Sequence, residues 1–116
     1  MNLYLDTSSF KAILKLEDTS TGETKEYEED FGREMAEKLL GYIRDKLAEN
    51  GKTWQDIKKI TFYSGPGSFT GLRIGATIVN TLAHELNVPL YDHKGNQRPV
   101  IIPDYGRPAN ISAPKK

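Results

Sequence analysis

Alternating and helically spaced apolar residues divide the first 92 positions of the chain into short segments. Residues 2–5 form an apolar run that ends in an Asp-Thr-Ser-Ser cluster, which favours a turn. Residues 11–17 alternate between apolar and polar positions, and a charged stretch follows at 23–29 after turn-forming residues. The pattern predicts three strands, of which the second and third form a hairpin and the third is an exposed, charged edge.

Two helices and two more strands are predicted downstream. Residues 33–50 carry apolar side chains at helical spacing and end at Asn50-Gly51, a helix stop. Residues 60–63 form a β-rich run, residues 69–86 a second helix and residues 88–91 a fifth short strand. The predicted order, β-β-β-α-β-α-β, is typical of an α/β domain with a mixed five-stranded sheet. It is the pattern of a single ribonuclease-H-like domain, the unit that actin-like (ASKHA) proteins use twice.

The composition changes after residue 92. Residues 93–116 contain four prolines and show little periodicity, and proline cannot continue a helix. The sequence therefore predicts a folded domain at 1–92 and a proline-rich, extended tail at 93–116.

Composition limits the function further. The 116 residues suit one domain, and 16 basic residues balance 16 acidic ones, so no global field attracts a phosphate backbone. The absence of cysteine excludes disulfides and thiolate chemistry. We expect a cytoplasmic protein, because the N-terminus does not read as a signal peptide and no apolar run approaches the ~20 residues that span a bilayer.

A glycine-rich loop joins the fourth predicted strand to the second helix. Glycines at such a junction can expose backbone amides to an anion, or can let the helix lie close to its neighbours. The loop matches neither the Walker A spacing nor Gly-x-Gly-x-x-Gly. The residues of a possible vestigial anion loop, which includes the turn after the first strand, are Asp6, Thr7, Ser8, Gly65, Gly67 and Ser68.

The apolar arcs of both helices are wider than the ~100° that packing on one sheet requires. The excess predicts a second contact, either with another subunit or with another part of this chain. The residues predicted to form a partner interface are Met35, Leu39, Tyr42, Ile43, Gly71, Ile74, Gly75, Ile78 and Leu82.

Enzymatic alternatives lack partners in the sequence. Asp6 occupies the place of a nuclease metal ligand, but the fourth strand ends in Tyr63-Ser64-Gly65 rather than in further carboxylates. The serines have only His84 and His93 as imidazole partners, and no nucleophile elbow surrounds them. We expect no catalytic residue, metal or cofactor.

The segment SGPGSFTGLRIG at residues 64–75 resembles the signature of the TsaB family. Leu5-Asp6-Thr7-Ser8 is similar to the first strand of that family and Leu39-Leu40-Gly41-Tyr42-Ile43 to its first helix, so that the resemblance runs from residue 2 to about residue 92. The second ribonuclease-H-like lobe of the family is missing, which makes this chain a shortened form.

The resemblance implies a non-catalytic scaffold of the bacterial machinery that attaches threonylcarbamoyl to tRNA adenosine (t6A). It implies pairing with a TsaD-like transferase through the two helices, a TsaE-like ATPase in the same complex, and only indirect contact with tRNA. A homodimer through the same helices is possible. The alternatives are a nucleotide- or metal-binding enzyme of the actin-like class and a homodimer with a role outside tRNA modification.

Overall fold

A six-stranded mixed sheet forms the centre of the computed structural model, which describes residues 1–9 and 11–104. Its strand order is β3-β2-β1-β4-β5-β6; β1, β4 and β5 are parallel, whereas the other neighbours pair antiparallel. The α/β class with a mixed sheet is confirmed, but the sheet has six strands rather than five. The strands are β1 (Asn2–Asp6), β2 (Lys11–Glu17), β3 (Thr24–Asp30), β4 (Lys59–Phe62), β5 (Leu90–Asp92) and β6 (Gln97–Arg98).

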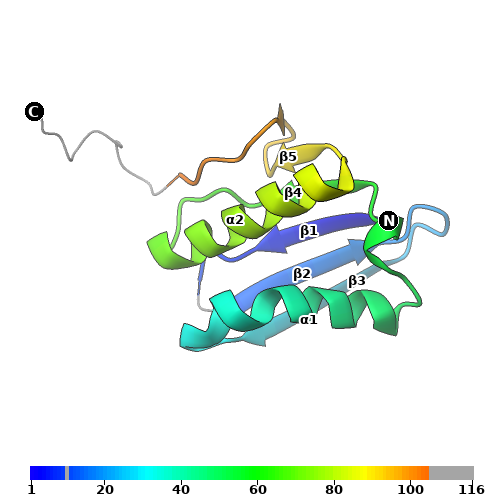
Figure 1. Ribbon diagram of the computed structural model, residues 1–116, viewed down its shortest axis with the longest axis horizontal. Coiled ribbons are helices and arrows are strands. Elements are labelled where there is room, and N and C mark those ends of the chain that lie inside the picture. The colour runs from blue at the N-terminus through cyan, green and yellow to red at the C-terminus, as the bar shows by residue number, and fades with distance from the viewer. Residues whose placement is uncertain (10, 105–116) are drawn as a thin grey trace, which may run out of the picture.

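Two helices, α1 (Met35–Glu49) and α2 (Phe69–Leu86), lie side by side on one face of this sheet (Figure 1). Single 3-10 turns precede α1 at Gly32–Glu34 and β4 at Trp54–Asp56. Within residues 1–9 and 11–104, neither helix combines the length and the apolar character needed to cross a membrane.

The core lies between the sheet and the two helices. Alternation along the strands turns Leu3, Leu5 and Phe62 toward the helices, where each is at most 1% exposed. The helices contribute a stripe every three or four residues, as amphipathic packing requires. Its members on α1 are Met35, Leu39, Ile43 and Leu47, and on α2 they include Leu72, Ala76, Val79 and Ala83.

No helix of the described chain covers the opposite face of the sheet, and polar side chains occupy it. The Lys15 ammonium lies 5.0 Å from the centre of the Tyr4 ring, and Lys59 lies 4.5 Å from that of Tyr91. Parallel strands usually have both faces buried and apolar. Here lysine stems cover the aromatic rings while their charged ends remain in water, so this face is compatible with solvent.

The segment predicted to be an extended tail contains structure of its own. Residues 97 and 98 form β6 and pair with β5, and the chain then runs along α2. Asn80 of α2 holds Ile101 there, because its side-chain amide bonds both the backbone N–H and the C=O of Ile101 at 2.8 and 3.1 Å. Residues 105–116 of the predicted tail lie outside the described residues.

Candidate functional site

The glycine-rich loop between β4 and α2 packs directly on the turn that follows β1. A side chain at Gly67 would come within 2.6 Å of the Ser8 Cβ, and the Ser68 N–H donates to the Ser8 carbonyl at 2.8 Å. Gly65 has a φ of +116°, and a Cβ there would overlap the Asp104 carbonyl oxygen. The loop is therefore in backbone contact with the turn after β1 at Gly67 and with residue 104 at Gly65, which only glycine permits at these positions.

The start of α2 is equally close to the end of β1. Thr7 is fully buried, and its hydroxyl donates to the Gly71 carbonyl at 2.6 Å. A Cβ at Gly71 would overlap the Thr7 carbonyl oxygen, and one at Gly75 would overlap the Thr7 hydroxyl and lie 2.5 Å from the Phe62 ring. These glycines allow α2 to lie on β1 and β4.

The polar groups of the possible anion loop bond to one another. One carboxylate oxygen of Asp6 accepts from the Ser8 N–H at 2.8 Å and from its hydroxyl at 2.6 Å. The Ser68 hydroxyl caps α2 by accepting from the Gly71 N–H at 3.3 Å. The structure thus brings Asp6, Ser8, Gly67 and Ser68 together through packing and capping contacts, whereas Thr7 contacts Gly71 and the close neighbours of Gly65 are Asp104 and Leu72.

Many residues of the predicted partner interface lie in the core of this chain. The wide apolar arcs predict an interface at these positions, but the sheet itself buries the larger part of each arc. The buried members are Met35, Leu39, Ile43, Gly71, Gly75 and Leu82, none of them more than about a tenth exposed.

Tyr42 is partly exposed but lies on the flank of α1 that faces away from α2. Its ring meets the Phe31 ring edge-on, with centroids 5.2 Å apart, and Lys46 lies over it at 5.2 Å. Burial raises the pKa of the Tyr42 hydroxyl. The wide arc of α1 is therefore explained in part by contacts within the chain, on its β3 side.

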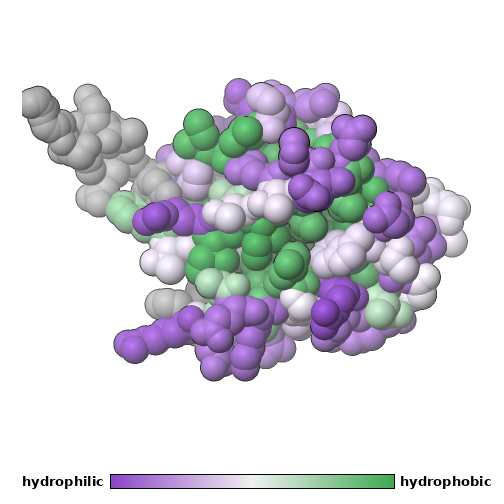
Figure 2. All heavy atoms as spheres, viewed as in Figure 1, coloured by the Kyte–Doolittle hydropathy of each residue, from purple (hydrophilic) through white to green (hydrophobic). Residues whose placement is uncertain are grey.

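Ile74 and Ile78 remain on the outer surface. With Ala36 of α1, Arg73 and Thr77 they line a shallow hollow of about 310 Å³ between the helices. Figure 2 shows hydrophobic side chains gathered along this part of the molecule. Leu40 is 47% exposed and is absent from the predicted interface, although a wheel of α1 places it beside the buried stripe on the same flank as Ala36. Phe69 is 44% exposed, but a wheel of α2 places it on the flank that carries Asn80, across the buried stripe from Ile74 and Ile78. We call Ala36, Leu40, Ile74 and Ile78 the two-helix surface.

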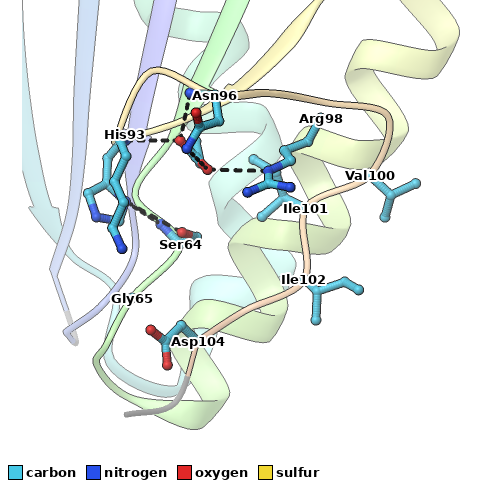
Figure 3. Close-up of a pocket in the computed structure, with 11 residues that line it drawn as sticks. Ser64, Gly65, His93, Asn96, Arg98, Val100, Ile101, Ile102 and Asp104 are labelled. Carbon is cyan, nitrogen blue, oxygen red and sulfur yellow. Dashed lines mark hydrogen bonds and ion pairs between the residues drawn. The ribbon is translucent and has the colours of Figure 1, made fainter.

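A second hollow, of about 320 Å³, lies beyond the carboxyl ends of β4 and β5 (Figure 3). The Ser64 N–H donates to His93 Nδ1 at 3.3 Å, and the His93 ring lies 4.5 Å from that of Tyr63. Asp92, which is 7% exposed, accepts from the N–H groups of Lys94 and Asn96, both at 2.9 Å, and lies 3.4 Å from Arg98. Sequence reasoning missed this cluster. The one feature of the sequence that indicates this turn is Asp92 followed within four residues by Gly95 and Asn96, because these residue types favour turns.

The hydrogen bonds to Asp92 make the stability of the β5–β6 hairpin depend on pH. Bonds from the Asn96 and Lys94 backbone and from Arg98 lower the pKa of Asp92. A carboxylate with a lowered pKa stabilises the fold above its unfolded pKa of about 4, and this contribution is lost as the pH falls through the folded value. We therefore expect Asp92→Asn to lower Tm at pH 7 and the difference from the parent to shrink below about pH 4.

Thermal unfolding monitored by circular dichroism from pH 7 down to pH 3 measures this difference. Asp45→Asn is the matched control, because the Asp45 carboxylate is 65% exposed and its recorded ion pair is with its neighbour Arg44. Equal Tm values for Asp92→Asn and Asp45→Asn at pH 7 would show that the hairpin does not depend on the Asp92 charge.

Nothing in residues 1–9 and 11–104 resembles a metal centre. In that part of the chain, no three histidine, aspartate or glutamate side chains are grouped so that they could hold an ion. Asp6, the residue that a nuclease would use, has its recorded hydrogen bonds with Ser8.

Comparison with known proteins identifies the family. The family model described as TsaD, tRNA N6-adenosine threonylcarbamoyltransferase, matches residues 21–92. The tRNA threonylcarbamoyladenosine biosynthesis protein TsaB of Bacillus subtilis is 33% identical over 90 residues, which cover 76% of this chain and 38% of that protein. TsaB of Escherichia coli is 38% identical over 58 residues, 50% of this chain and 25% of that protein.

Solved structures agree with these relatives. YeaZ from Pseudomonas aeruginosa superposes with a TM-score of 0.72 at 35% identity, over 78% of this chain and 42% of that chain. Another Pseudomonas aeruginosa structure, described as an uncharacterised protein with similarity to peptidase YeaZ, gives a TM-score of 0.73. The present chain spans about two fifths of the length of the TsaB of Bacillus subtilis and of these structures. It belongs to the family that the matching model describes, in the group of the TsaB and YeaZ proteins.

Proposed function

We propose that this chain is a non-catalytic scaffold subunit in the biosynthesis of threonylcarbamoyladenosine in tRNA. The observation that carries the proposal is the two-helix surface, where apolar side chains from both helices are exposed together. Apolar side chains gathered on one face of a small protein mark a site of protein association. The names of the TsaB relatives supply the pathway.

The fold supports this assignment. We propose that residues 1–92 are one ribonuclease-H-like domain of the actin-like class, with a central strand β1 between an antiparallel and a parallel neighbour. The groups of the loops after β1 and β4 are bonded to one another, which favours support over catalysis.

The partner we propose is a TsaD-like transferase that packs on the two-helix surface, in a cytoplasmic complex that also contains a TsaE-like ATPase. The transferase would hold the tRNA. A second copy of this chain could occupy the same surface, and the two complexes would then exclude each other.

Charged substitutions on the two-helix surface test this interface. Leu40→Asp and Ile78→Asp each place a charge where the partner would pack, and we expect either to weaken binding at least about 30-fold, because an unpaired buried charge costs 2 kcal/mol or more. The measurement is isothermal titration of the chain with the TsaD-like protein of the same organism. The surface is present in the free chain, so circular dichroism can confirm that each variant still folds.

Ile102→Asp is the matched control, because Ile102 is 81% exposed and lies in the segment after β6, outside the two-helix surface. It should bind as the parent does. Failure of the parent to bind, or equal affinities for Ile78→Asp, Leu40→Asp and Ile102→Asp, would refute the proposed interface.

A further inference from the structure

Strand β3 is an edge of the sheet and has one open side (Figure 1). Its register with β2 is continuous from Thr24 to Asp30, so no bulge interrupts the strand, and β3 contains no proline. Every residue of β3 except Tyr27 is exposed. A regular edge of this length presents a row of backbone groups that another extended chain can use.

The alternation of hydrogen bonds shows which backbone groups of β3 face outward. At the closed end of the hairpin, the Asp18 N–H donates to the Glu23 C=O at 2.8 Å. Such pairs recur at every second residue of an antiparallel ladder, so Lys25 and each second residue after it bond to β2. The N–H and C=O groups of Glu26 and Glu28 therefore point away from β2, and they have no partner in the part of the chain that the structure describes.

The charge of β3 is mainly of one sign. The strand carries four carboxylates and one lysine, Lys25. Lys11 of β2 lies 3.0 Å from Glu28, and Lys15 lies 3.8 Å from Glu26. The Glu28 and Glu26 side chains nevertheless remain 49% and 57% exposed, so that a second cation can approach each of them.

This charge excludes a second copy from the same edge. Two β3 edges paired antiparallel about Tyr27 would place Glu26 of one copy opposite Glu28 of the other, and like charges directly opposite each other are destabilising. Charged side chains commonly protect edge strands in this way. Charges of one sign do not, however, exclude a chain of the opposite sign, because complementary charges favour association and select the partner.

We propose that β3 binds an extended, basic segment of a partner protein, which adds a strand to the sheet. Lysine or arginine side chains at alternate positions of this segment lie opposite Glu26 and Glu28, on the face of the sheet away from the helices. The positions between them lie beside the Tyr27 ring and suit a β-branched residue, because aromatic and β-branched side chains pair well across strands. The surface is separate from the two-helix surface, so this binding goes beyond the proposed function.

A peptide of alternating lysine and valine, as long as β3, tests the pairing. Hydrogen exchange is measured by NMR on the isotope-labelled chain with and without saturating peptide. The peptide should slow exchange of the Glu26 and Glu28 amides at least about tenfold, because these amides gain a partner. The Lys25 and Tyr27 amides, which already bond to β2, should change little. Unchanged exchange at Glu26 and Glu28, or the same effect from a peptide with glutamate in place of lysine, would contradict the proposal.

Two variants separate the charge from the backbone hydrogen bond. Glu26→Gln removes one carboxylate, whereas Glu26→Pro also removes an outward N–H, a loss that an edge strand tolerates. By NMR titration, the lysine peptide should bind Glu26→Gln about threefold and Glu26→Pro at least about tenfold more weakly than the parent. Circular dichroism establishes that each variant is folded, and Glu26→Gln tests the charge whether or not the proline variant folds.

Glu85→Gln is the matched control, because it makes the same chemical change at an exposed position of α2. It should bind the peptide as the parent does. Equal affinities for Glu85→Gln, Glu26→Gln and Glu26→Pro would overturn the proposed site. Slow exchange of the Glu26 and Glu28 amides before peptide is added would also overturn it, since this chain or a second copy would then cover the edge. None of these results would bear on the TsaD-like partner, whose proposed contact is the two-helix surface.

Discussion

Replacing Gly75 by alanine should lower the free energy of unfolding by about 3 kcal/mol. The added methyl group would overlap the buried Thr7 hydroxyl and lie 2.5 Å from the Phe62 ring. Neither neighbour can move away freely, because Thr7 is bonded to Gly71 and Phe62 is completely buried. In a domain of this size the change corresponds to a fall in Tm of more than about 10 °C, which thermal unfolding by circular dichroism would record.

Gly41→Ala is the matched control, because Gly41 also lies within a helix. An added Cβ there would meet nothing nearer than the Arg44 guanidinium at 3.7 Å. Since alanine favours a helix over glycine, this variant should be more stable by about 0.5–1 kcal/mol. If both variants gained stability, α2 could not lie as close to β1 as the structure places it.

The role of the glycines illustrates how far the sequence could lead. The run from Gly65 to Gly75 indicates a tight strand-to-helix junction, and the structure has one. Gly67, Gly71 and Gly75 approach atoms of Thr7 and Ser8, almost 60 residues or more earlier in the chain, and Gly65 approaches Asp104, 39 residues later. Local pattern does not specify such a contact, because it depends on β1 and β4 being parallel neighbours.

The end of the described chain was the least predictable part. A strand of two residues, β6, has no periodicity to detect, and its position depends on the turn that Asp92 stabilises. The four prolines favour an extended chain, and residues 99–104 are without regular secondary structure. That this segment would lie on α2 follows only from the pairing of Asn80 with Ile101, two residues that no local motif connects.

The division of α1 into a buried and an exposed side could be predicted only in part. Helical spacing identifies an apolar arc, but it does not show which side chains of the arc pack on the sheet and which remain exposed to a partner. Leu39 is completely buried, whereas its neighbour Leu40 is 47% exposed. The site prediction includes Leu39 in the partner interface and not Leu40, but in this structure Leu39 lies in the core and Leu40 on the surface.

Alanine substitutions at these two leucines should therefore have very different effects. Leu39→Ala removes a side chain from the centre of the core and leaves a cavity, so it should lower the free energy of unfolding by about 3 kcal/mol. Leu40→Ala should change it by no more than about 0.5 kcal/mol, because the side chain is half in solvent and alanine is a strong helix former. Chemical denaturation of both variants measures the difference.

Binding gives the opposite order. Under the proposed function, Leu40→Ala should weaken association with the TsaD-like protein by up to about tenfold, the loss expected when one exposed leucine is removed from an interface. Leu39→Ala, measured at a temperature where it is still folded, should bind almost as the parent does, because its side chain never reaches the surface. Loss of stability in Leu40→Ala, or loss of binding in Leu39→Ala alone, would mean that α1 is rotated about its axis relative to the structure described.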